Sequence, residues 1–185
     1  MKNEDELLKI IQNDHWMIHV LELVEKLNIL DCWVCAGFIR NKVWDTLHGY
    51  LERTVLNDID VIYYDNKNLS EKEEKRIEEL LYKMAPEEPW SVKNQARMHK
   101  KNQFLPYKST YDGIAHFPEV PTAIGARLNK GQLEIIAPYG LEALFTEIVE
   151  PTPYFKQSES LYQVYLERVK IKNWKQKWPR LQIIK

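Results

Sequence analysis

Residues 58–64 form an apolar run that is interrupted by two aspartates, Asp58 and Asp60. The β-branched and aromatic residues of this run predict a β-strand. Successive side chains of a strand point to opposite faces, so both carboxylates share one face while Ile59 and Val61 share the other. Two carboxylates on one face of a core strand are costly unless a cation neutralises them. The run therefore predicts a sheet strand with a divalent metal beside it, although a solvated strand end would also carry such a pair.

Helical and strand patterns alternate through the first half of the chain. Helical periodicity covers residues 4–29, and Asn13 and Asp14 divide that stretch into two helices. Ser70 and Glu73 form a capping box, which predicts the start of a later helix. In chain order we expect a strand at residues 31–36, a helix at 39–50, the strand at 58–64, the capped helix, and a strand at 90–96.

The second half of the chain is less regular. Residues 100–120 contain two prolines and several polar residues, which predicts a long loop or a broken helix. Residues 122–128 and 132–137 predict a hairpin, and a further helix is expected around Tyr165. Because strands and helices interleave first and strands dominate later, we assign the chain to the α+β class (α/β-like), with a mixed β-sheet flanked by helices.

The chain has 185 residues, which is the length of a single domain. We divide it into N-terminal helices at 1–30, a core at 31–150, and a C-terminal helix and tail at 151–185. A membrane span needs about 20 apolar residues, and no apolar stretch approaches that length. The N-terminus is acidic and does not resemble a signal peptide. We therefore expect a cytoplasmic protein without a membrane partner. The formal net charge of -1 does not indicate a nucleic-acid partner, although RNA stays possible.

Two further features favour packing over function. Cys32 and Cys35 form a C-x-x-C pair, but positions three apart in a strand face opposite sides, which favours two buried, reduced cysteines over a redox or zinc site. The segment after Glu167 contains seven basic residues and no acid, together with Trp174 and Trp178. Such a segment can bind single-stranded RNA. More often its tryptophans pack on the body of the protein while its lysines stay solvated, and we favour that interpretation.

A third acid, Glu134, interrupts another apolar run. Glu134 faces one side of the expected strand, whereas Leu133 and Ile135 face the other. Its carboxylate has the same burial cost as Asp58 and Asp60, and one shared metal site would relieve all three. Because the three ligands are carboxylate oxygens, Mg²⁺ is the expected ion. A position at the edge of the sheet is the structural alternative for Glu134.

The turn at Ala36, Gly37 and Phe38 joins an expected strand to an expected helix. A glycine there lets backbone N–H groups approach a phosphate, and the helix N-terminus favours the negative charge. Arg40 lies one turn into the helix, and its guanidinium fork suits phosphate oxygens. We therefore expect Gly37, Phe38 and Arg40 to bind a nucleotide. The structural alternatives are a simple turn and an ion pair between Arg40 and Asp45.

The end of the strand at residues 90–96 concentrates hydrogen-bonding side chains. Asn94 and Gln95 are suited to a base edge, and Arg97 is suited to a phosphate, so we include all three among the nucleotide-binding residues. A polar strand end followed by an exposed basic turn is the alternative. Together with the three carboxylates, these groups predict two-metal phosphoryl transfer, in which Mg²⁺ bridges carboxylates and nucleotide phosphates.

Residues 36–41 and 58–60 resemble the Gly-Gly-x-Val-Arg-Asp and Asp-Ile-Asp signature of tRNA CCA-adding enzymes and poly(A) polymerases. These enzymes belong to the nucleotidyltransferase superfamily that includes DNA polymerase beta. The whole chain is more similar still to a family of small bacterial nucleotidyltransferase-like proteins. That similarity covers AGFIRNKVWD, NDIDVIYYD, WSVKNQARMH, LEIIAPYGLEALF and WPRL. The resemblance implies a nucleotidyltransferase fold.

The same resemblance implies roles for individual residues. The matched positions are the metal-binding pair Asp58 and Asp60, the third carboxylate Glu134, the phosphate-turn glycine Gly37 and the signature arginine Arg40. Three positions depart from the superfamily pattern. Ala36 stands where the first glycine is usual, Asn41 replaces an aspartate, and Glu134 is longer than the usual aspartate.

The function that the resemblance implies is a Mg²⁺-dependent transfer of a nucleotidyl group from an NTP, with ATP expected, to an unidentified acceptor. One alternative is a catalytically silent nucleotide- or RNA-binding module of the same fold. Another is an interaction protein of the toxin–antitoxin type. The sequence contains no recognisable acceptor-binding domain that would name the acceptor.

Overall fold

The computed structural model describes residues 2–185 and is built around a five-stranded mixed sheet. The strand order is β3-β2-β1-β4-β5, and only β2 and β3 run parallel to each other. The strands are β1 (Trp33–Cys35), β2 (Ile59–Tyr63), β3 (Trp90–Asn94), β4 (Gly125–Asn129) and β5 (Gln132–Ile136). This mixed sheet with helices confirms the predicted α+β class.

Helices flank the sheet on both sides. In the first half these are α1 (Lys2–Gln12), α2 (His15–Lys26), α3 (Gly37–His48), α4 (Glu71–Met84) and α5 (Gln95–Met98). They are followed by η1 (His99–Asn102), α6 (Thr110–Ala115), η2 (Val120–Thr122), α7 (Glu142–Phe145), η3 (Pro153–Lys156), α8 (Glu159–Lys172) and α9 (Trp174–Lys177). A second, parallel pair of short strands joins β6 (Ile148–Val149) to β7 (Gln182–Ile183). None of the described helices is long and apolar enough to cross a membrane.

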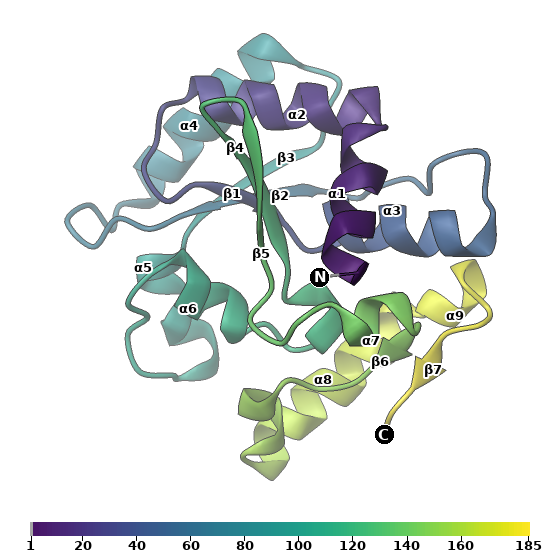
Figure 1. Cartoon of the computed structure of the whole chain (residues 1–185). Coiled ribbons are helices and arrows are strands. Elements are labelled where there is room, and N and C mark those ends of the chain that lie inside the picture. Colours follow the sequence, from purple (N-terminus) through teal and green to yellow (C-terminus); the bar gives the residue numbers. More distant parts are fainter. Residues whose placement is uncertain (1) are drawn as a thin grey trace.

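The two faces of the sheet are covered unequally. One face presents Val34, Val61 and Val92 to the larger core, which includes side chains of α2, α3 and α4. The other face presents Trp33 and Ile62 to a much smaller cluster that Ile114 of α6 completes. Figure 1 shows α2 and α4 on one side of the sheet and α5 and α6 on the other. The thinly covered face leaves room for a cavity.

Several predicted boundaries are confirmed. Asp14 caps the N-terminus of α2, and its Oδ1 accepts a hydrogen bond of 3.1 Å from the amide of Met17. Ser70 begins α4, where its hydroxyl accepts from the amide of Lys72 at 3.3 Å. Glu73 does not complete the capping box, because its carboxylate pairs with Arg76 instead. Residues 100–120 contain the end of η1, the short α6 and the start of η2, so the broken-helix alternative is correct.

The cysteines and the C-terminal tryptophans have structural roles. Cys32 packs in the larger core and Cys35 in the smaller cluster, as the opposite faces of the strand require, and both thiols are free. Trp174 and Trp178 are buried, and their ring centroids lie 5.9 and 5.1 Å from that of Trp44. The packing interpretation of the basic C-terminal segment is therefore confirmed. The pairing of β7 with β6 was not predicted.

Candidate active site

The two aspartates lie at the start of β2, on the thinly covered face of the sheet. Asp60 pairs in register with Cys35 of β1 and Ser91 of β3, and it lines a cavity of about 300 Å³. Asp58 precedes the strand and is exposed. Ile62, two residues after Asp60, lines the same cavity. The alternation expected from the sequence thus places Asp60 at an opening rather than in the packed core.

Asp60 lies in an environment that disfavours its negative charge. Burial and the neighbouring charge of Asp58 raise the pKa of Asp60 to about 6, although Lys172, Arg40 and Arg168 act in the opposite direction. Within residues 2–185, neither Asp58 nor Asp60 forms an ion pair with a basic side chain. The pair therefore offers carboxylate oxygens that no ion pair occupies, and carboxylate oxygens are the ligands that Mg²⁺ prefers.

The turn between β1 and α3 forms part of the cavity wall through Ala36. Ala36 has φ 57° and ψ -119°, a region that L side chains rarely adopt. Gly37 begins α3 without a positive φ, and a Cβ placed on it would meet its neighbours at an ordinary 3.5 Å. The turn therefore demands the conformational freedom of glycine at position 36 and not, as the sequence suggested, at position 37.

The N-terminus of α3 directly follows Ala36, and its first backbone amides have no protein partner among the described residues. No side chain caps the helix, and the amide of Arg40 donates to the carbonyl of Ala36 as the first regular helical bond. In the described part of the chain, the amides of Gly37 and Phe38 donate to no protein acceptor. Free amides at a helix N-terminus favour a negatively charged ligand.

Arg40 is buried and braces the turn. Its Nη1 donates to Oγ1 of Thr122 at 2.8 Å, its Nη2 donates to Oδ1 of Asn41 at 2.9 Å, and its guanidinium lies 4.7 Å from the ring centroid of Trp174. Burial lowers the pKa of Arg40 to about 10. The alternative ion pair with Asp45 is wrong, because Asp45 accepts its hydrogen bonds from Thr54 and Trp178 instead. The structure therefore supports a bracing role for Arg40.

Glu134 does not join the aspartate pair. It lies on the edge strand β5, which β1 and β4 separate from β2. Since neighbouring strands are about 4.8 Å apart, the sideways separation is roughly 14 Å. The carboxylate of Glu134 instead accepts from Nε of Arg127 at 2.7 Å and from Asn129 at 2.8 Å. The sheet-edge alternative is thus correct, and the described residues contain no cluster of three or more His, Cys, Asp or Glu side chains that could hold a metal.

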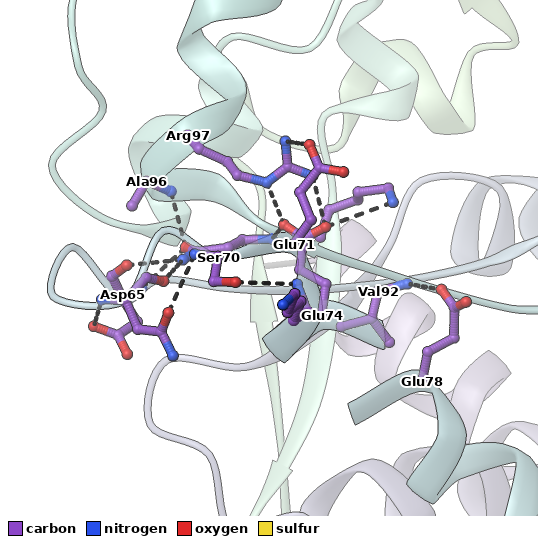
Figure 2. A network of polar contacts seen from close by, with 12 residues as sticks. Asp65, Ser70, Glu71, Glu74, Glu78, Val92, Ala96 and Arg97 are labelled. Carbon is purple, nitrogen blue, oxygen red and sulfur yellow. Dashed lines mark hydrogen bonds and ion pairs between the residues drawn. The ribbon is translucent and has the colours of Figure 1, made fainter. Parts of the chain in front are cut away.

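Arg97 belongs to the polar network shown in Figure 2, which Asn94 joins through Glu74, and neither residue lines the cavity. The side chain of Asn94 accepts from the amides of Asp65 and Ala96 and donates to the carbonyls of Asp65 and Asn68. All hydrogen-bonding positions of this amide group are thereby occupied. This corrects the expectation that Asn94 contacts a nucleotide.

Arg97 is held by acids of α4. Its Nε and Nη2 donate to the two carboxylate oxygens of the buried Glu74 at 2.6 and 2.7 Å, and its Nη1 pairs with Glu71 at 3.0 Å (Figure 2). Each of its three nitrogens pairs with a carboxylate of α4, which corrects the expectation of a phosphate contact. The network instead fixes the start of α5 against α4.

Gln95 does face the cavity. It is 4% exposed, and no hydrogen bond to its side-chain amide occurs in the described part of the chain. A Cβ at Gly113 of α6 would come within 2.6 Å of its Oε1, so a larger residue there would force the Gln95 side chain to move. The Gln95 amide therefore presents an unused donor and acceptor to the cavity.

Sequence reasoning missed several residues around the cavity. Ser91 and Lys93 lie on β3 beside Asp60 and Ile62. Their alternation along the strand was visible in the sequence, but the pairing of β3 with β2 was not. Arg168 of α8 also lines the cavity, and no local pattern distinguishes it from the other basic residues of that segment.

Comparison with known proteins adds an independent observation. The sequence model of a protein family described as "Nucleotidyltransferase" matches residues 22–183. A solved structure, described as an NMR structure that reveals a CCA-adding enzyme head domain, is similar over 100% of this chain and 97% of its own, with 34% identity and a TM-score of 0.88.

Another solved structure, described as tRNA-processing enzyme complex 3, aligns with 85% of this chain and 48% of its own, at 13% identity and a TM-score of 0.46. No curated protein matches the chain.

Proposed function

Because the chain belongs to the nucleotidyltransferase family, we propose that it transfers a nucleotidyl group from an NTP to an acceptor in a Mg²⁺-dependent reaction. The observation that carries this proposal is the position of Asp60. Its carboxylate is desolvated, lacks an ion-pair partner in the described residues, and lies in a cavity whose wall includes Ala36 at the open N-terminus of α3. A cation and a phosphate group would complement these two features together.

Asp58 and Asp60 are the residues that would hold Mg²⁺. Mg²⁺ commonly binds proteins through one or two carboxylates and takes further oxygen ligands from substrate phosphates, so two aspartates suffice. When bound, the metal would neutralise phosphate charge and activate the acceptor oxygen, in the two-metal form if the phosphates supply enough ligands. Glu134 has no part in this proposal, since Arg127 and Asn129 hold its carboxylate elsewhere.

Backbone and side-chain groups of the cavity would position the nucleotide. The amides of Gly37 and Phe38 would donate to a phosphate, while Arg40 keeps the turn in place through Thr122. The amide of Gln95 would contact the base. ATP is the first nucleotide to test. The 34% identity to a structure described as a CCA-adding enzyme head domain supports an RNA 3′ end as the first acceptor to test.

The separation of Glu134 from the pair supports a second candidate, a module that binds nucleotide without turnover. Incubation with α-labelled NTPs, Mg²⁺ and total RNA distinguishes the two. Label transferred by the wild type but not by Asp60→Asn indicates an enzyme. Mg²⁺-dependent NTP binding with no transfer indicates the silent module, and no binding at all contradicts both. Glu134→Gln is the matched control, because it makes the same chemical change on the same face of the sheet.

A further inference from the structure

A second arginine, Arg168, faces the cavity from α8. Its side chain is 34% exposed and lines the same cavity as Asp60 and Ala36. Figure 1 shows α8 on the same side of the sheet as α5 and α6. Arg168 therefore lines the cavity together with Asp60 and with Ala36, which precedes α3.

Arg168 is oriented by a buried acid. Glu119 is 0% exposed, and its carboxylate accepts from Nε of Arg168 at 2.8 Å and from Nη2 at 3.5 Å. The backbone of Glu119 is fixed as well, since its carbonyl accepts from the amides of Thr122 and Ala123. A carboxylate that is removed from water and held by its backbone fixes the direction of the guanidinium that it binds.

The same turn serves both arginines of the site. Glu119 holds Arg168, and Thr122, three residues later, accepts from Arg40. Among the described residues, Nη1 of Arg168 has no hydrogen-bond partner, whereas both terminal nitrogens of Arg40 are used. Arg40 Nε also lacks a partner, but that atom is buried, so Nη1 of Arg168 is the donor that can be offered to a ligand in the cavity.

The location of the aspartates limits which part of a nucleotide Arg168 can meet. A metal held by Asp58 and Asp60 takes phosphate oxygens as further ligands, so the polyphosphate must lie next to them. Arg168 and Lys172 are the α8 cations whose charges act on Asp60. Lys93 lines the cavity from β3. Its Nζ lies 3.7 Å from Oε2 of Glu74, whose negative charge compensates that of the lysine. Lys101 of η1 also lines the cavity and forms no ion pair in the described part of the chain, but Arg168 is the cavity cation whose direction a buried carboxylate fixes.

We propose that Arg168, oriented by Glu119, binds the terminal phosphates of the NTP and gives the site its preference for a triphosphate over a monophosphate. This inference rests on the proposed nucleotide-binding function. It assigns to α8 a role that neither the family match nor the signature residues assign. A guanidinium with a fixed direction is suited to recognising phosphate groups at one end of the ligand.

Calorimetric titration of the full-length protein with ATP and AMP, each with Mg²⁺, tests the inference. The wild type should bind ATP more tightly than AMP. Arg168→Ala should weaken ATP binding by about tenfold to a hundredfold, as expected for a charge-assisted hydrogen bond, and change AMP binding less than about twofold. Arg168→Lys should recover part of the preference, because it keeps the charge and loses the fork.

Two further variants separate orientation from charge. Glu119→Gln should also lower the ATP preference, because Arg168 loses its fixed direction, while circular dichroism verifies that this buried substitution leaves the protein folded. Lys170→Ala is the matched control, because it removes an exposed cation from the same helix without touching the cavity. Its ATP preference should equal that of the wild type.

The outcomes separate this inference from the proposed function. If the wild type binds no nucleotide with Mg²⁺, the proposed function fails and this inference fails with it. If the wild type prefers ATP and Arg168→Ala keeps that preference, only the role of Arg168 is overturned. An equal loss of ATP and AMP binding in Arg168→Ala also overturns it, because it indicates that Arg168 only shapes the cavity.

Discussion

Asp60 of β2 and Cys35 of β1 are register partners, and the thiol of Cys35 donates a hydrogen bond of 3.5 Å to the carbonyl of Asp60. Because β1 leads through Ala36 directly into α3, this pairing sets the N-terminus of α3 beside the start of β2. The free amides at the start of α3 and the carboxylate of Asp60, to which we assign the phosphate and the cation, are thereby brought together by one pair of antiparallel strands. Both proposals on the nucleotide depend on this adjacency.

Asp60→Asn should stabilise the metal-free protein at neutral pH. Burial and Asp58 raise the pKa of Asp60 from 3.8 to about 6, so the folded protein holds this proton more tightly than the unfolded chain does. The stability that Asp60 contributes is therefore complete below about pH 4 and is lost as the pH rises through about 6. Removing the charge should raise the free energy of unfolding at pH 7 by at most about 3 kcal/mol. Chemical unfolding measured across this pH range checks the sign.

Two controls accompany the measurement on Asp60. Glu134→Gln should not stabilise the protein, because hydrogen bonds from Asn129 and Arg127 lower the pKa of Glu134 and favour its charged form. Mg²⁺ should raise the free energy of unfolding of the wild type at pH 7 and leave that of Asp60→Asn unchanged. An Asn variant that is no more stable than the metal-free wild type would show that water compensates the buried charge.

The structure also explains which parts of the site were predictable. Asp58 and Asp60 were recognised because strand alternation is a local property of the sequence. Glu134 was placed on the correct face by the same argument, but its distance from the pair depends on the strand order β2-β1-β4-β5, which no local pattern encodes. Arg168 was missed for the same reason, since only the tertiary fold brings α8 to the cavity.

Ala36→Gly should stabilise the protein by about 1 kcal/mol. The backbone of Ala36 has φ 57° and ψ -119°, and such a conformation costs a residue with a Cβ about 1–3 kcal/mol. Glycine adopts it freely but loses about 0.5–1 kcal/mol through the greater entropy of the unfolded chain. It also gives up the buried methyl group of Ala36, so the net gain is smaller than the strain released. Thermal unfolding measures the gain.

Ala126→Gly is the control for the substitution at Ala36. Ala126 is buried in β4 with ordinary strand geometry, so glycine there brings only the entropic cost and the loss of a packed methyl group. This variant should be destabilised. A fall in stability at both positions would mean that the turn at Ala36 holds no strain.

Glu74→Leu should destabilise the protein by about 2–3 kcal/mol. The substitution leaves Arg97 and the amide of Asn94 without their buried acceptor, and breaking such a pair costs more than the pair itself contributes. Nucleotide affinity should fall as well, because the network positions Gln95 at the start of α5. Urea unfolding provides the measurement.

The matched control for Glu74 lies on the same helix. Arg76 pairs with Glu73 on the solvent side of α4, where the side chain of Arg76 is 58% exposed. Arg76→Ala should leave stability almost unchanged, because exposed ion pairs of this kind contribute little. Equal losses from the two variants would contradict the distinction between the buried network and the surface pair.

Gly113→Ala should weaken nucleotide binding by displacing Gln95. The added Cβ would approach Oε1 of Gln95 to 2.6 Å, and the amide must then rotate away from its position in the cavity. A double-mutant cycle isolates this cause. If the amide contacts the base, Gly113→Ala lowers ATP affinity in the wild-type background by several-fold and has no further effect in Gln95→Ala. Equal effects in both backgrounds would mean that the new methyl group blocks the cavity itself and that Gln95 makes no contact with the base.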